Sequence, residues 1–301
     1  MAPTDTLTFD SHNPVTNEVI TSHENFNEIA VRAAVDRARN AAQEWRELGF
    51  RGRRKVLLKW SSDLLANIDA LAELVSLETG KPTSDAKLEA SLAAGHIAWA
   101  ARHAESVMRT SHRSPGLLMA NMSATVERSP VGVVGVIGPW NYPVFTPLGS
   151  IAYALAAGNT VVFKPSEYTP GVGVYLAQSF IDSSLLADVF TCVTGLGETG
   201  KYLCESGVDK LAFTGSTRTA KIVAATCAAH MTPVVLECGG KDPVIVAHDA
   251  DIKRAADATV WSAFSNAGQT CIGAERVYVD ERVADKFIEK VLEIAKDIHP
   301  G

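Results

Sequence analysis

The sequence predicts an α/β fold in which a doubly wound parallel sheet is followed by the start of a second α/β domain. From Val131 onward, short apolar segments rich in β-branched residues alternate with segments of helical spacing, and glycine-rich turns separate several of them. Strands that alternate with helices are typical of a parallel sheet. The 301 residues have 47% hydrophobic side chains, which is enough for a large core and two domains.

The chain begins with a helical region that extends from about residue 24 to residue 112. Apolar side chains recur there at helical spacing and predict one buried stripe. The members of this stripe are Ala34, Ala38, Ala41, Trp45 and Leu48. Gly80 followed by Pro82 predicts a helix end, and a second long helix is expected over residues 86–108. The helical pattern then breaks, so residues 117–128 are expected to form an extended arm.

The alternating region supplies the predicted sheet. Its strands are expected at residues 131–137, 160–163, 189–193, 210–213 and 233–236. Its helices are expected at residues 151–157, 171–181, 201 onward and 219–229. A further strand–helix–strand–helix series is expected at residues 243–246, 252–267, 276–279 and 283–298. The domain boundary is placed near Gly239–Gly240, which gives domains of residues 1–238 and 239–301.

Composition and charge exclude several classes of protein. The net charge is −6, so no dominant basic field is available to bind nucleic acid or an anionic membrane. No apolar run is long enough to cross a bilayer, and the N-terminus is too polar for a signal peptide. The five cysteines include no CxxC pair, which predicts neither a disulfide framework nor a zinc cluster. A reduced cytoplasmic protein is therefore expected.

Gly195, Gly197 and Gly200 form a G-x-G-x-x-G pattern between a predicted strand and a predicted helix. Such a turn holds a dinucleotide in many α/β domains, although a lone match also fits an ordinary glycine-rich turn. Together with Lys201 the segment nearly matches a phosphate-binding P-loop. Tyr202 stands where that loop needs a metal-binding hydroxyl, so a nucleoside triphosphatase is rejected.

Two further strand ends offer groups that suit a nucleotide. Lys164 and Glu167 follow a buried strand, at the edge where open α/β sheets bind ligands, and Glu167 could accept hydrogen bonds from ribose hydroxyls. Ser216 is a good N-cap for the next helix, whose free amides could hold phosphate. A solvated strand end and plain helix capping explain the same residues without a ligand.

Three residues offer chemistry for a carbonyl group. Cys271 lies in the small, polar segment SNAGQTCIG and could act as a nucleophile, and Asn141 in PWNYP offers an amide for an oxyanion. Glu237 follows an apolar strand, where partial desolvation would raise its pKa and suit a general base. Taken singly, Cys271 also fits an inert buried thiol, and Glu237 also fits a surface strand end. No histidine falls within these motifs, so no Cys–His pair and no metal site is predicted.

The set of motifs resembles the aldehyde dehydrogenase superfamily. The matching segments are PWNYP, GNTVVFKPSE, FTGST, LECGGKDP and SNAGQTC, in the family's order. The resemblance implies NAD(P)-dependent oxidation of an aldehyde to a carboxylic acid. It implies that Cys271 adds to the aldehyde and that Asn141 and the Cys271 backbone N–H stabilise the oxyanion. It also implies that Glu237 activates the water that hydrolyses the thioester.

The resemblance further implies a dinucleotide-binding first domain. The phosphate-side helix would start at Ser216, and the glycine-rich turn at Gly195 would be a peripheral loop of the cofactor site. The expected cofactor-binding residues are Ile137, Pro139, Trp140, Lys164, Ser166, Glu167, Gly197, Gly200, Phe213, Gly215, Ser216 and Thr219. NAD is the expected cofactor and NADP the alternative, because Glu167 would meet a 2′-phosphate with like charge.

The chain departs from the family pattern at Ala220, Cys238 and Asp242, none of which removes a catalytic group. Family chains continue well past Gly301, so a C-terminally truncated member with an incomplete catalytic domain is expected. The expected partners are an aldehyde and, in the complete protein, further copies of the chain in a dimer or tetramer, with residues 113–130 as a candidate oligomerisation arm. Two alternatives stay open: a non-catalytic fragment that binds nucleotide or packs with a partner, and a CoA-acylating relative.

Overall fold

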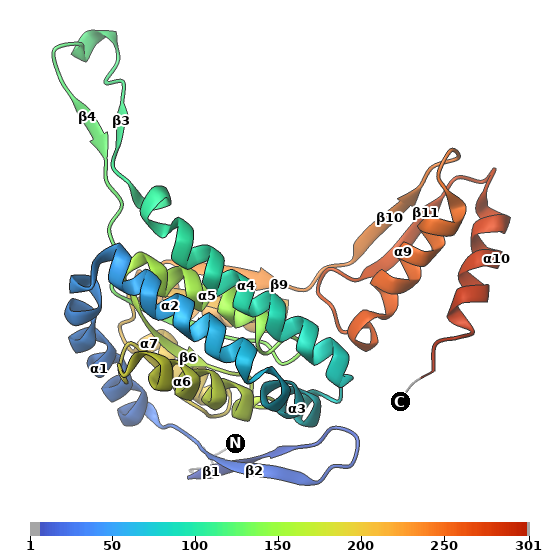
Figure 1. Ribbon diagram of the computed structural model, residues 1–301, viewed down its shortest axis with the longest axis horizontal. Coiled ribbons are helices and arrows are strands. Elements are labelled where there is room, and N and C mark those ends of the chain that lie inside the picture. Colours follow the sequence, from blue (N-terminus) through green and yellow to red (C-terminus); the bar gives the residue numbers. More distant parts are fainter. Residues whose placement is uncertain (1–6, 300–301) are drawn as a thin grey trace. The chain divides into compact units, whose positions relative to one another are not determined.

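The computed structural model describes residues 7–299, and the chain divides into two compact units, Met1–Glu237 and Cys238–Gly301 (Figure 1). The sequence pattern places the division after residue 238.

A five-stranded sheet forms the centre of the first unit. Its strands are β5 (Val133–Ile137), β6 (Thr160–Lys164), β7 (Phe190–Cys192), β8 (Lys210–Gly215) and β9 (Val234–Cys238), in the order β7-β6-β5-β8-β9. The pairs β5–β6, β5–β8 and β6–β7 are parallel. From β5 the chain adds strands first on one side and then on the other. The predicted doubly wound α/β fold is confirmed.

Both faces of this sheet are covered by helices. They are α1 (Glu28–Glu47), α2 (Gly49–Ala66), α3 (Ile68–Thr79), α4 (Thr83–Met108), α5 (Phe145–Ala157), α6 (Pro170–Ser184), α7 (Gly197–Glu205) and α8 (Thr217–Ala229). Successive strand residues point to opposite faces. Val134 and Val136 accordingly join a core cluster with helices α2 to α6, whereas Val133 and Ile137 join a second cluster with α1, α7 and α8. This double burial explains why the central strands β5 and β6 are almost continuous apolar runs in the sequence.

Two antiparallel hairpins extend the first unit. β1 (Thr8–His12) pairs with β2 (Val19–Glu24), a hairpin that the sequence patterns do not predict. β3 (Ser111–Arg113) pairs with β4 (Ala124–Val126) and carries the short helix η1 (Leu117–Met119) at its tip. Leu117 and Leu118 are 93% and 96% exposed there, so this arm presents an apolar tip to solvent.

The second unit is smaller. It consists of β10 (Asp242–Val246), α9 (Ile252–Phe264), η2 (Ser265–Gly268), β11 (Ala274–Val279) and α10 (Ala284–Ala295), and β10 and β11 are parallel. Val246, Ala256 and Phe287 are the buried residues of its core. The helix α9 ends at Phe264 rather than at residue 267, because Asn266 and Ala267 have positive φ angles that a right-handed helix does not allow.

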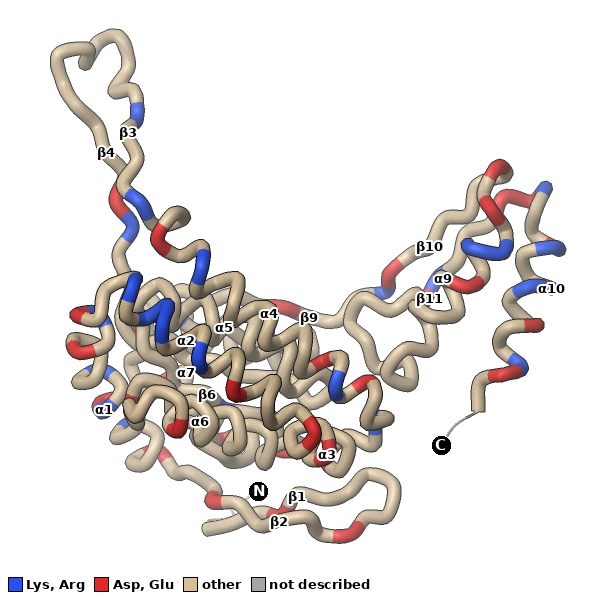
Figure 2. The backbone as a smooth tube through the Cα atoms, in the orientation of Figure 1, with Lys and Arg blue, Asp and Glu red and all other residues tan. Residues whose placement is uncertain are grey.

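Charged side chains of both signs are interspersed along the helices of both units (Figure 2). Among residues 7–299, no helix is long and apolar enough to cross a membrane. The same residues contain no group of three or more His, Cys, Asp and Glu side chains that could hold a metal ion.

Candidate active site

Three predicted cofactor residues lie side by side at the carboxyl edge of the sheet. Ile137 ends β5 and is in register with Lys164 on β6 and with Phe213 on β8. The strand order reverses between β5 and β8, and ligands of open α/β sheets bind beside such a point. The Gly138 amide donates to the Lys164 carbonyl at 3.0 Å and keeps the chain beyond β5 close to this edge.

The glycine-rich turn borders the same edge. Gly195 has a φ of +152°, and a Cβ there would lie 2.0 Å from Thr199 Oγ1, so only glycine fits. A Cβ at Gly200 would lie 3.8 Å from Ile137 Cδ1 and 3.9 Å from Lys164 Cδ. Gly197 has nothing within 4 Å of such a position and is exposed. Gly200, in the first turns of α7, therefore faces Ile137 and Lys164 at the strand edge.

Lys164 is buried and Glu167 is not. Lys164 Nζ lies 3.5 Å from Glu167 Oε2, and their side chains are 4% and 41% exposed. Burial lowers the pKa of Lys164, and the Glu167 carboxylate partly opposes that shift. Ser166 between them is buried, and its hydroxyl accepts from the Tyr168 amide at 3.3 Å. The Glu167 carboxylate is therefore accessible to solvent at the sheet edge, beside the Lys164 ammonium group.

Ser216 begins α8 as predicted by the pattern FTGST. Its hydroxyl accepts from the Thr219 amide at 3.2 Å and lies 3.0 Å from the Thr219 hydroxyl. The backbone of Gly215 passes close to Phe213, since a Cβ there would lie 2.7 Å from the ring. Ser216, Thr217 and Arg218 are all exposed, so the first turn of α8 is accessible to an anion.

The loop between β5 and α5 carries Pro139, Trp140 and Asn141. Trp140 is 39% exposed and Asn141 is half-buried. The backbone of Asn141 is held from a distant part of the chain, since Lys81 Nζ donates to the Asn141 carbonyl at 2.8 Å. The sequence patterns do not assign Lys81 to the site. Its ion-pair partner Glu89 could have been noticed, because it is a charged residue among the buried alanines of α4, and a buried charge needs a partner.

Cys271 lies in the second unit, in a turn between η2 and β11. Three consecutive left-handed residues precede it: Asn266, Ala267 and Gly268 have φ angles of 54°, 56° and 74°. Non-glycine residues in this region store strain and are frequent at functional sites. A Cβ at Gly240 would lie 3.2 Å from the Cys271 carbonyl oxygen, so the chain after β9 passes directly beside the turn. Cys271 itself is exposed.

The thiols differ in accessibility. Cys204 and Cys227 are buried, and desolvation raises the pKa of Cys204 to about 12 and also raises the pKa of Cys227. Desolvation likewise raises the pKa of Cys192, beside Lys164. Cys238 and Cys271 are the exposed thiols. The inert-thiol interpretation therefore suits three of the cysteines and not Cys271.

The three candidate catalytic residues are divided between the units. Asn141 and Glu237 belong to the first unit, and Cys271 belongs to the second. Glu237 lies near the end of β9 with an exposed side chain. The sequence predicts partial desolvation of Glu237, but its side chain is exposed to solvent in the structure.

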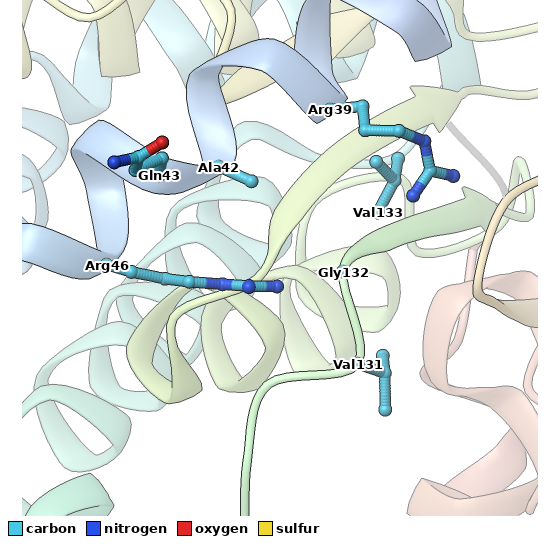
Figure 3. Close-up of a pocket in the computed structure, with 7 residues that line it drawn as sticks. All are labelled: Arg39, Ala42, Gln43, Arg46, Val131, Gly132 and Val133. Atoms are coloured by element: carbon cyan, nitrogen blue, oxygen red, sulfur yellow. The ribbon is translucent and has the colours of Figure 1, made fainter.

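A shallow cavity lies at the other end of β5. It is lined by Arg39, Ala42, Gln43, Arg46, Val131, Gly132 and Val133 (Figure 3). Arg39 is already paired there, since its Nη1 lies 2.8 Å from Asp209 Oδ2. The cavity contains none of the predicted site residues, which gather at the carboxyl edge.

Comparison with known proteins identifies relatives for the whole chain. The pattern of the "Aldehyde dehydrogenase family" matches residues 1–301. Succinate-semialdehyde dehydrogenase (NADP+) of Escherichia coli K12 is 37% identical over 97% of this chain and 60% of that protein. Glutarate-semialdehyde dehydrogenase of Pseudomonas aeruginosa is 36% identical over 93% of this chain and 58% of that protein.

Solved structures agree with these relatives. An NADP-dependent enzyme of Escherichia coli superposes with a TM-score of 0.92 at 37% identity, over 97% of this chain and 60% of that one. PnpE in complex with nicotinamide adenine dinucleotide superposes with a TM-score of 0.91 at 34% identity, over 97% of this chain and 60% of that one. The chain spans about three fifths of the length of the relatives it matches.

Proposed function

Since the chain belongs to the aldehyde dehydrogenase family, we propose that the full-length protein oxidises an aldehyde to a carboxylic acid with a nicotinamide dinucleotide. The observation that carries this proposal is the carboxyl edge of the sheet, where Ile137, Lys164 and Phe213 are in register. The E. coli relative uses NADP+ by its name, and the PnpE structure contains the dinucleotide.

The residues at this edge fit such a cofactor. Glu167 has free carboxylate faces for ribose hydroxyls, and the first turn of α8 has exposed amides for a phosphate. Pro139 and Trp140 would line the cofactor, with Ser166, Gly197, Gly200, Gly215 and Thr219 around it. When bound, a nicotinamide dinucleotide supplies the acceptor for the hydride that the substrate carbon loses. Glu167 favours NAD over NADP, because a 2′-phosphate beside its carboxylate adds like charge.

The chemistry is assigned to three side chains. The Cys271 sulfur attacks the aldehyde carbon and forms a C–S bond, while the carbonyl oxygen takes negative charge. The Asn141 side-chain amide and the Cys271 backbone N–H donate to that oxygen. Loss of hydride from the carbon leaves a thioester on Cys271. Glu237 accepts a proton from water, the hydroxide attacks the thioester, and the C–S bond breaks to release the acid and the Cys271 thiolate. Glu237 then passes its proton to solvent.

The test is steady-state reduction of NAD by the full-length protein, with short aliphatic, aromatic and semialdehyde substrates and with analysis of the acid product. Asn141→Ala is expected to lower kcat by ~100- to 1000-fold, the usual cost of one oxyanion donor. Glu237→Gln is expected to permit one fast turnover and then stall at the thioester. Full steady-state turnover by both variants would refute the assigned roles.

A further inference from the structure

A buried ion pair links the start of α4 to the loop that carries Asn141. Lys81 follows α3, and Glu89 lies one and a half turns into α4. Lys81 Nζ lies 2.6 Å from Glu89 Oε2, and the two side chains are 3% and 1% exposed. Both charges are therefore almost completely removed from water.

Hydrogen bonds from both members of this pair reach one segment, residues 141–145. Lys81 Nζ donates to the Asn141 carbonyl at 2.8 Å and lies 4.4 Å from the centroid of the Tyr142 ring. Glu89 Oε1 accepts from the amides of Val144 and Phe145 at 2.8 and 3.1 Å. The pair thus contacts four of the five residues from 141 to 145 through backbone or ring.

Stability alone is a weak explanation for the pair. Desolvating two charges costs as much as their attraction returns, and apolar side chains of similar volume often stabilise a core as well or better. The pair does provide something that apolar residues cannot. Val144 gives α5 no side-chain cap, and the Glu89 carboxylate takes up the first amides of that helix from another element.

We propose that Lys81 and Glu89 are positioning residues for the Asn141 side-chain amide. Lys81 fixes the Asn141 carbonyl, Glu89 fixes the start of α5, and the peptide units between these anchors hold the amide in one orientation. The inference rests on the proposed function, in which Asn141 stabilises the oxyanion. A displacement of about 1 Å at such a donor is enough to cost up to ~100-fold in rate.

The chain contains a matched control for this pair. Glu78 lies in the last turn of α3, is 3% exposed, and accepts from the amides of Gly171 and Val172 at 2.9 and 3.0 Å. It therefore caps α6 in the way that Glu89 caps α5, but its backbone partners lie at Gly171 and Val172 rather than in residues 141–145. Glu78→Gln removes a buried helix-capping carboxylate without disturbing the Asn141 anchors.

The kinetic test is a double-mutant cycle in the full-length protein. Lys81→Met and Glu89→Gln are each expected to lower kcat by ~10- to 100-fold, with little change in the KM for the aldehyde. In an Asn141→Ala background the same substitutions are expected to lower kcat little further, because the group they position is gone. Glu78→Gln is expected to leave kcat near that of the parent protein. An equal loss in both backgrounds, or an equal loss in Glu78→Gln, would overturn the inference.

Hydrogen–deuterium exchange decides the positioning without turnover. Lys81→Met and Glu89→Gln are expected to speed exchange in the segment 139–148 and not in the segment 166–176, and Glu78→Gln is expected to do the reverse. Unchanged exchange in 139–148 would refute the inference even if Asn141 is catalytic. If Asn141→Ala has normal kcat, the role proposed for Asn141 in the reaction is refuted. The exchange measurement still tests separately whether Lys81 and Glu89 hold the segment 139–148.

Discussion

The two units position their candidate site residues by different means. In the first unit, Ile137, Lys164 and Phe213 are fixed by strand register within a sheet that is buried on both faces. In the second unit, Cys271 lies in a turn that follows three residues with left-handed backbone conformation. The core of that unit is small, and its buried members are Val246, Ala256 and Phe287. A registered sheet holds the proposed cofactor residues, and a turn that follows left-handed residues holds the proposed nucleophile. We therefore expect the two units to respond differently to the same kind of substitution.

The largest expected effect separates chemistry from cofactor binding. Cys271→Ser should lower the kcat of the full-length protein by roughly 10⁴-fold or more, because the nucleophile is lost. The same variant should bind NADH with unchanged affinity, because the proposed cofactor residues lie in the first unit. Enzyme assay and NADH fluorescence titration measure the two quantities. A parallel loss of NADH binding would break the division of roles.

Core truncation should show how unequal the two units are. Phe180→Ala in the first unit should lower the free energy of unfolding by ~3–5 kcal/mol, the usual cost for a buried phenylalanine. Phe287→Ala removes the largest member of the small core, so it should unfold the second unit while exchange in β5 and β6 stays slow. Hydrogen exchange resolved by unit is the measurement. If Phe287→Ala accelerated exchange in β5, the units would not be independent.

The pH dependence of the first unit should reveal Glu78. Burial raises the pKa of this carboxyl from 4.5 to about 7, against the opposing effect of the Gly171 and Val172 amides. The folded state then binds this proton more tightly than the unfolded state. The contribution to stability is complete below pH 4.5 and declines as the pH rises toward about 7. The slope is at most about 1.4 kcal/mol per pH unit.

Glu78→Gln should remove that slope, because the amide does not titrate. Urea unfolding of both proteins at several pH values between 4.5 and 7 makes the comparison. Parallel curves for the two proteins would contradict the assignment of this pH dependence to Glu78.

The smallest effect concerns the turn at Cys271. A Cβ at Gly240 would lie 3.2 Å from the Cys271 carbonyl oxygen and 2.5 Å from Asp242 Oδ2, whereas a Cβ at the neighbouring Gly239 meets nothing within 4 Å. Gly240→Ala should cost about 1 kcal/mol and change the rate at which iodoacetamide alkylates Cys271. Gly239→Ala is the control and should change neither quantity. Mass spectrometry should also find Cys271 and Cys238 alkylated before the buried Cys204 and Cys227, and the opposite order would contradict the exposures described above.

Much of the fold follows from local patterns, and the errors have physical causes. The central strands β5 and β6 were predictable because a strand that is buried on both faces consists almost entirely of apolar residues. The start of α5 was not, since the helix begins at Phe145 whereas the pattern suggests residue 151. The Val144 amide at its start donates to Glu89, which lies 55 residues earlier in the chain. A local sequence pattern does not predict a contact over that separation.

The candidate site was also predictable where local patterns define it and unpredictable where long-range contacts do. Cys271, Glu237 and Asn141 are visible as motifs because the chemistry proposed for them requires particular residue types at strand ends and turns. Lys81, Glu89 and Glu78 pair with backbone groups of distant segments. The sequence can mark Glu89 as a charge within an apolar stripe, but only the folded chain reveals the partners of the three residues. The exposure of Glu237 likewise depends on neighbours that a strand pattern does not specify.

The capping of α5 by Glu89 has a consequence for the order of folding. The contact joins residues that are 55 and 56 positions apart, so its loop must close before the first turn of α5 gains its acceptor. The segment around Asn141 therefore gains these two acceptor contacts only when α4 is packed against it.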